Sequence, residues 1–193
     1  MSGVRRAISS RPACRARLAA AIFAAIVAFP FNLSGQAAKA TESQVKAAYL
    51  ANFGRFVEWP SKRPDGKDAS FNICVLGQDP VGADLDAAVI GETIGRVRMA
   101  AKKILRPQDA ADCRVLFIAS EDGHRKEFLA GLETLSVLTV SDMPEFIRRG
   151  GMVQFLLDGN KVRFEVNLEA TDRVGLKLSS ELLKLAVSVR RKP

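Results

Sequence analysis

Short apolar segments alternate with helix-start signals through the middle of this chain, and that alternation limits the folds it can adopt. Four segments are rich in aliphatic residues and predict strands: Phe71–Leu76, Val97–Leu105, Arg114–Ala119 and Ser136–Val140. The first, third and fourth lead into glycine, aspartate or serine residues that can open a helix. Because such alternation with short connections builds a parallel sheet covered on both faces, we expect an α/β fold of three layers, α/β/α, with a mostly parallel sheet.

The later part of the sequence predicts an antiparallel hairpin at one edge of that sheet. Two apolar segments, Met152–Leu157 and Lys161–Leu168, flank Asp158-Gly159-Asn160, a turn sequence that tolerates positive φ. The second segment alternates apolar and polar residues, so one of its faces is expected to meet solvent as an outer strand. Two further helices are predicted, one over Thr41–Glu58 and one after Ser179 that places Leu182, Leu185 and Val189 on one stripe. A helix is also expected after Ser141-Asp142, ending at Gly150.

The first 40 residues are predicted to be an export signal. Arginines precede the apolar run Leu18–Phe29, Pro30 breaks that run, and Ala38-Lys39-Ala40 supplies small residues that a signal peptidase recognises. The run is shorter than the roughly 20 residues that span a membrane, although a short membrane anchor is the alternative. We therefore expect residues 1–40 to be a signal peptide and residues 41–193 to form a single domain in the periplasm.

The charge of the expected mature chain is almost balanced. Six of the 29 basic residues lie in the first 40 residues, which hold no acid, so the rest of the chain carries 23 basic against 21 acidic residues. A nucleic-acid-binding domain would keep a strong basic excess in its folded part. We therefore expect no nucleic acid among the partners.

Two cysteines, Cys74 and Cys113, remain in the expected mature chain. An even number fits an oxidising compartment, and two buried free thiols are the alternative. In the common doubly wound strand order the first strand neighbours the third, which would place Cys74 and Cys113 on adjacent strands. A bridge between them would stabilise the fold.

Few residues in the sequence could carry catalysis. The chain has one histidine, His124, which is expected to lie at the start of a helix among charged neighbours. The two cysteines lack the spacing of a zinc site, and nucleophile-elbow, phosphate-loop and dinucleotide motifs are missing from the sequence. We therefore expect no catalytic residue, no metal and no cofactor.

One possible ligand site follows from the topology. The loops after three parallel strands should meet at the carboxyl edge of the sheet, where ligands bind in open α/β folds. Helix starts there would offer N–H groups to a ligand. The candidate residues are Gly77, Asp79, Ser120 and Ser141. Alternatively, the aspartate and serine side chains only cap their own helices.

Several stretches together resemble the YfiR-like family. The most specific are VKAAYLANFGRFVEWP (Val45–Pro60) and the closing GLKLSSELLKLA, joined by FNICVLGQDPVG and DCRVLFIA. The resemblance covers essentially the whole expected mature chain. It implies a periplasmic regulator, which is not an enzyme and can be dimeric. Such a regulator represses an inner-membrane diguanylate cyclase by binding its periplasmic sensor domain, and so limits cyclic di-GMP, biofilm and exopolysaccharide.

The resemblance also implies redox control through disulfides. Cys74 and Cys113 match positions that form a bridge in this family, whereas a second cysteine pair found near the final hairpin of better-known members is missing here.

The residues expected to contact the partner lie toward the C-terminal end. Arg163, Glu165, Asn167 and Lys177 are predicted to project together from the outer strand and the C-terminal region. A solvated edge kept soluble by charge is the alternative for this face. A small-molecule sensor that uses the carboxyl-edge crevice is the alternative function.

Overall fold

The computed structural model describes residues 39–60, 70–78, 80–119, 129, 131–132 and 134–191. Eight strands in this part of the chain form one sheet in the order β10-β8-β7-β6-β5-β2-β4-β3. Its parallel centre consists of β4 (Val97–Ile104), β2 (Phe71–Leu76), β5 (Val115–Ile118), β6 (Leu138–Ser141) and β7 (Val153–Asp158). Counted along the chain, these strands lie in the doubly wound order 2-1-3-4-5, so the predicted α/β fold and the adjacency of β2 and β5 are confirmed.

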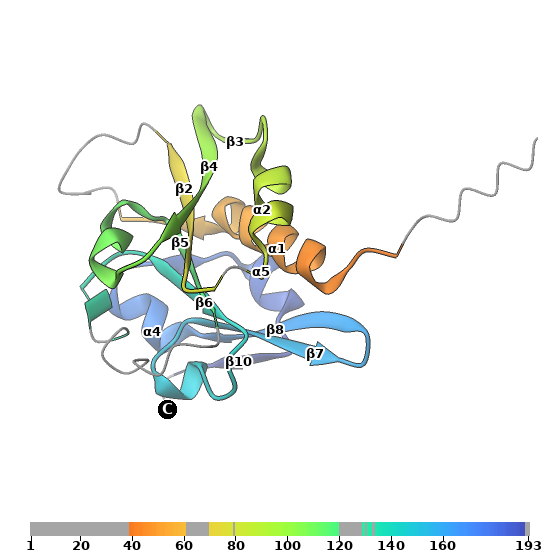
Figure 1. The fold of residues 1–193 in the computed structure, drawn as a ribbon. Coiled ribbons are helices and arrows are strands. Elements are labelled where there is room, and N and C mark those ends of the chain that lie inside the picture. The colour runs from red at the N-terminus through yellow and green to blue at the C-terminus, as the bar shows by residue number, and fades with distance from the viewer. Residues whose placement is uncertain are drawn as a thin grey trace, which may run out of the picture. The chain divides into compact units, whose positions relative to one another are not determined.

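Antiparallel pairs flank the parallel centre of the sheet on both sides. The predicted hairpin is formed by β7 and β8 (Lys161–Asn167), and the short β3 (Thr93–Ile94) pairs with β4 at the other end. In Figure 1 the hairpin tip and the β3–β4 end lie far apart. The prediction that β8 is the outermost strand is wrong over its last residues, because β10 (Ser188–Arg190) pairs parallel with Glu165–Asn167.

Helix α1 (Glu42–Phe56) covers one face of the sheet. Its start is fixed by a capping box, in which the Thr41 hydroxyl accepts from the Gln44 N–H and the Gln44 side chain accepts from the Thr41 N–H. Ala47, Leu50 and Phe53 are buried toward the sheet, where the Phe53 ring lies 6.1 Å from that of Phe155 and 5.6 Å from that of Phe164. Each such fully buried aromatic contributes roughly 1.5–3 kcal/mol.

A second hydrophobic cluster covers the opposite face, which establishes the three layers. It includes Cys74, Leu116 and Phe146, packed beneath the 3₁₀ segments η1 (Pro107–Asp112) and η2 (Ile147–Arg149) and the described residues near Leu132. Short elements complete the described chain: β1 (Val57–Glu58), α2 (Gly82–Val89), α4 (Leu168–Arg173), β9 (Lys177–Leu178) and α5 (Ser180–Leu185). β1 and β9 form a separate two-stranded sheet.

Three predicted helices differ from the structure. The first ends at Phe56, two residues early, because Val57 and Glu58 pair with β9. The helix expected after Ser141 is a turn followed by the 3₁₀ segment η2, since Glu145 takes a positive φ of 64° that interrupts helical geometry. The closing helix ends at Leu185, because the next residues extend alongside β8 and become β10. The helix expected from Ser120 lies largely outside the described residues, as does His124.

Candidate functional site

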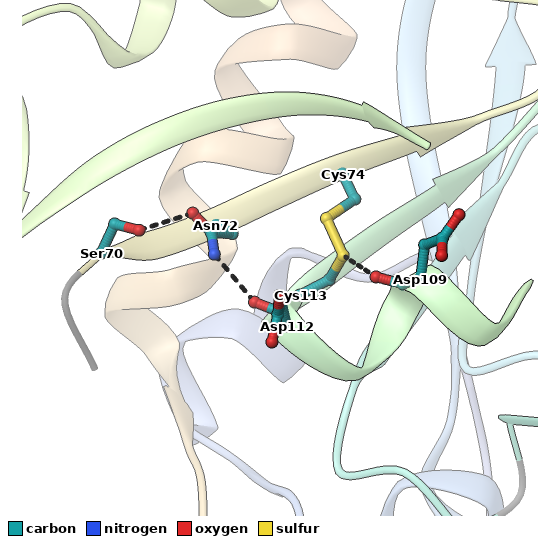
Figure 2. Close-up of a disulfide and its surroundings, with 6 residues drawn as sticks. All are labelled: Ser70, Asn72, Cys74, Asp109, Asp112 and Cys113. Atoms are coloured by element: carbon teal, nitrogen blue, oxygen red, sulfur yellow. Dashed lines mark hydrogen bonds between the residues drawn. A yellow bond between two sulfur atoms is a disulfide. The ribbon is translucent and has the colours of Figure 1, made fainter. Parts of the chain in front are cut away.

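Cys74 and Cys113 form a disulfide across the adjacent strands β2 and β5, with their Cα atoms 5.8 Å apart. Cys74 lies within β2 and Cys113 stands two residues before β5, and both are completely buried. Figure 2 shows the hydrogen bonds that hold this end of β2: the Asn72 amide donates to the Asp112 carbonyl at 2.9 Å, and the Ser70 hydroxyl donates to Asn72 Oδ1 at 2.7 Å. The bridge therefore joins two central strands in a dry environment.

At the carboxyl edge of the sheet, the Ser141 hydroxyl is fully engaged inside the protein. It donates to the Ile118 carbonyl at 2.7 Å and accepts from the Met143 N–H at 3.1 Å, and Ser141 is completely buried. Gly77 adopts a φ of 92° directly after β2, a conformation that favours glycine. Asp79 and Ser120 lie outside the described residues. Of the four candidates, the described residues include only Gly77 and Ser141, and the Ser141 hydroxyl is occupied by backbone groups of Ile118 and Met143. The ligand site at this edge stays a prediction.

A buried lysine ties α1 to the same edge. Lys46 Nζ lies 2.6 Å from Glu42 Oε1 and 2.7 Å from Asp142 Oδ2, just after β6. Burial alone would lower the pKa of Lys46, but its hydrogen bonds to Asp142 and Glu42 and the attraction of both carboxylates raise that pKa above 10.5. Asp142 Oδ1 is buried with no hydrogen-bond partner among the described residues. The negative charge of the Asp142 carboxylate is therefore balanced by Lys46.

The four residues predicted to contact a partner differ in their exposure and do not all belong to one sheet. Arg163 is exposed and Glu165 half-buried on the same face of β8. Asn167 shares that face by register but is only 5% exposed, because its amide donates to the carbonyls of Ile147 and Gly151 and its oxygen caps α4. Lys177 is exposed on β9, in the other sheet. Arg163 and Glu165 are therefore the two of the four that share an accessible strand face.

A surface feature that the sequence analysis missed runs along α1. Two hollows, of about 670 and 480 Å³, adjoin there and share Ala40, Val45 and Tyr49 as walls. The smaller hollow lies between α1 and α5 and is lined by Phe53, Phe56 and Leu185. The larger lies between the start of α1 and the tip of the β7–β8 hairpin. We call the two together the α1 trough.

The sequence does contain one signal for this trough. The outward residues Gln44, Ala48 and Asn52 recur every four positions and are all uncharged and exposed. A solvated helix face more often carries charged side chains. The walls from the β7–β8 hairpin and α5 come from residues more than 100 positions after α1, and only the fold brings them together with that helix.

These features define a doubly wound α/β domain with a buried disulfide and a surface trough that is apolar between α1 and α5 and charged at the hairpin. Helices long and apolar enough to cross a membrane are lacking in the described part of the chain. The protein belongs to the YfiR/HmsC-like family, whose model matches residues 43–187. This family comprises periplasmic regulators of diguanylate cyclases rather than catalysts.

A solved structure supports the fold independently. The chain is similar to a conserved domain protein from Vibrio cholerae O1 biovar El Tor strain N16961, with 10% sequence identity and a TM-score of 0.51. The match covers 79% of this chain and 61% of that protein. Identity at this level shows a shared fold alone.

Proposed function

We propose that this protein represses an inner-membrane diguanylate cyclase by binding the cyclase's periplasmic sensor domain. The observation that carries the proposal is the family match, which spans nearly the whole domain from the start of α1 to the residues before β10. Repression then requires only that the regulator bind the inactive form of the cyclase more tightly than the active form. Lower cyclic di-GMP would in turn limit biofilm and exopolysaccharide.

Export is part of the same proposal. Residues 1–40 act as a signal peptide, and the domain that follows works in the periplasm. The disulfide supports this location, since such bonds persist in oxidising compartments. The mass of protein isolated from the periplasm tests it: a chain beginning near Thr41 is expected, and a chain that retains the first 40 residues would contradict it.

The bridge between Cys74 and Cys113 makes the regulator responsive to redox conditions. Both sulfur atoms are fully buried, so a reductant reaches them only when the covering segments open. The response therefore acts through the stability of the domain. Arg163 and Glu165, on the accessible face of β8, are the proposed polar contacts to the cyclase.

Gene deletion with complementation tests the repression. Cyclic di-GMP and surface attachment should rise on deletion and return to the original level when the gene is restored. Deleting each membrane diguanylate cyclase in the same background identifies the partner as the one whose loss abolishes the rise. Unchanged cyclic di-GMP in the deletion strain would refute the proposed function.

A further inference from the structure

We propose that the α1 trough is the docking groove for an amphipathic, acidic helix of the regulated partner. This inference rests on the proposed function and names the surface and the chemistry that carry it out. Both hollows of the trough are partly open to solvent, whereas pockets for small molecules enclose most of their ligand. A groove along a helix that is apolar at one end and charged at the other is a form that accepts an amphipathic partner helix.

Exposed apolar side chains lie in both parts of the trough. Leu185 is 57% exposed in the hollow between α1 and α5, and Leu157 is 59% exposed in the hollow at the hairpin. Between them, Ala48 presents a small side chain on the outward ridge of α1. Large apolar side chains left in water on a folded domain, set around a groove, mark an interaction site. A helix with an apolar stripe would cover both leucines and the ridge.

The charge of the trough selects an acidic partner. Two cations of the expected mature chain line the hollow at the hairpin: Lys161 and Arg163. Among the described residues that line this hollow, one carboxylate, Glu42, opposes them, and it shares the buried Lys46 with Asp142, at 2.6 and 2.7 Å. The lining of this hollow therefore keeps a small excess of positive charge. Acidic residues flanking the apolar stripe of the incoming helix would complement it and speed association.

A pair of charge variants at Ala48 tests both the surface and its chemistry. Ala48→Glu and Ala48→Lys place side chains of similar length and opposite charge on the same exposed helix position, and both residues are good helix formers. The probe is the full-length cyclase identified above, held in lipid nanodiscs, and the readout is its affinity for each periplasmically purified variant. Lys102→Glu, on the exposed β4 near the opposite end of the sheet, is the matched surface control.

Ala48→Glu is expected to weaken binding at least tenfold, whereas Ala48→Lys and Lys102→Glu stay within about threefold of the wild type. The double variant Lys161→Glu/Arg163→Glu should also lose at least tenfold and flatten the salt dependence. Thermal unfolding of each variant verifies that the fold is intact.

Other outcomes overturn the proposal in distinguishable ways. Wild-type binding by Ala48→Glu would exclude the trough while leaving repression standing. Equal losses with both Ala48 variants would refute the acidic chemistry. A wild-type dimer that dissociates in Ala48→Glu would assign the trough to a second copy of the chain instead. Failure of the wild type itself to bind the cyclase would refute the proposed function, and the inference with it.

Discussion

Reducing the bridge between Cys74 and Cys113 should lower the stability of the domain by about 4 kcal/mol. The two cysteines are 39 residues apart in sequence. Closing a loop of that length removes about 13 cal/mol/K of entropy from the unfolded chain, or about 4 kcal/mol at 25 °C. For a domain of roughly 150 residues this corresponds to a fall of about 12 °C in Tm. Reduction keeps both sulfur atoms in place, so the comparison leaves side-chain volume almost unchanged.

Urea unfolding followed by tryptophan fluorescence measures this loss. The chain has a single tryptophan, Trp59, whose ring packs 5.3 Å from that of Phe71 at the edge of the core. Periplasmic protein is compared with the same protein reduced in urea and refolded in reductant. A difference under about 1 kcal/mol would refute the loop-entropy argument for this bridge.

The burial of the bridge gives the experiment an internal control. Both cysteines are completely buried, so thiols should appear in the native protein far more slowly than in urea. A chromogenic thiol reagent follows their release. Equal rates with and without urea would contradict the burial seen in the structure.

Three substitutions test other parts of the fold, each by its change in the free energy of unfolding in urea. Lys46→Met should cost about 2–3 kcal/mol at pH 7, because it removes the cation that pairs with the half-buried Asp142, whose Oδ1 is buried without a hydrogen bond among the described residues. Because the pKa of Lys46 is raised in the folded protein, its contribution to the free energy of unfolding is complete below pH 10.5. The wild type loses that contribution as the pH rises through the higher pKa of the folded state, whereas Lys46→Met has no such loss. Gly54→Ala should cost about 1–3 kcal/mol, because its methyl group would overlap Ile94 Cδ1 and the Phe71 ring, and a neutral result would contradict the close packing of α1 on β2 and β3. Glu145→Gly should stabilise by about 1 kcal/mol by relieving a positive φ of 64°, and a loss would show that the Glu145 side chain outweighs the strain.

The central sheet could be predicted because its strands are buried on both faces. Phe71–Leu76 and Val115–Ile118 are apolar almost without interruption and end at turn residues, so local sequence and tertiary position agree. The closing segment could not be predicted in the same way. Leu182, Leu185 and Val189 have helical spacing, but the Val187 N–H donates to the Phe164 carbonyl at 2.9 Å and the chain joins the sheet. Pairing with β8 overrides the local periodicity there.

The candidate sites also include features that the sequence predicts and features that it does not. The disulfide followed from strand order, which the sequence predicts, whereas Asn167 alternates like an exposed residue and is buried by the η2 segment that folds over it. The α1 trough was missed because its walls come from α1, the β7–β8 hairpin and α5. Its recognition depends on the distance between these elements, which no local pattern encodes.

The disulfide and the α1 trough lie on opposite faces of the sheet, and this arrangement determines how redox state can influence partner binding. Cys74 belongs to the cluster beneath η1 and η2, whereas Phe53 of the trough belongs to the cluster under α1. A domain of ordinary stability, about 5–15 kcal/mol, stays mostly folded after losing about 4 kcal/mol.

Reduced but folded protein should therefore bind the cyclase within about threefold of the oxidised affinity, and binding should fall only as the temperature approaches the lowered Tm. Affinity and Trp59 fluorescence, measured on the same reduced sample over a temperature series, separate the two effects. A tenfold loss of affinity while the fluorescence still reports folded protein would show that the bridge shapes the docking face directly, through β2 and β5.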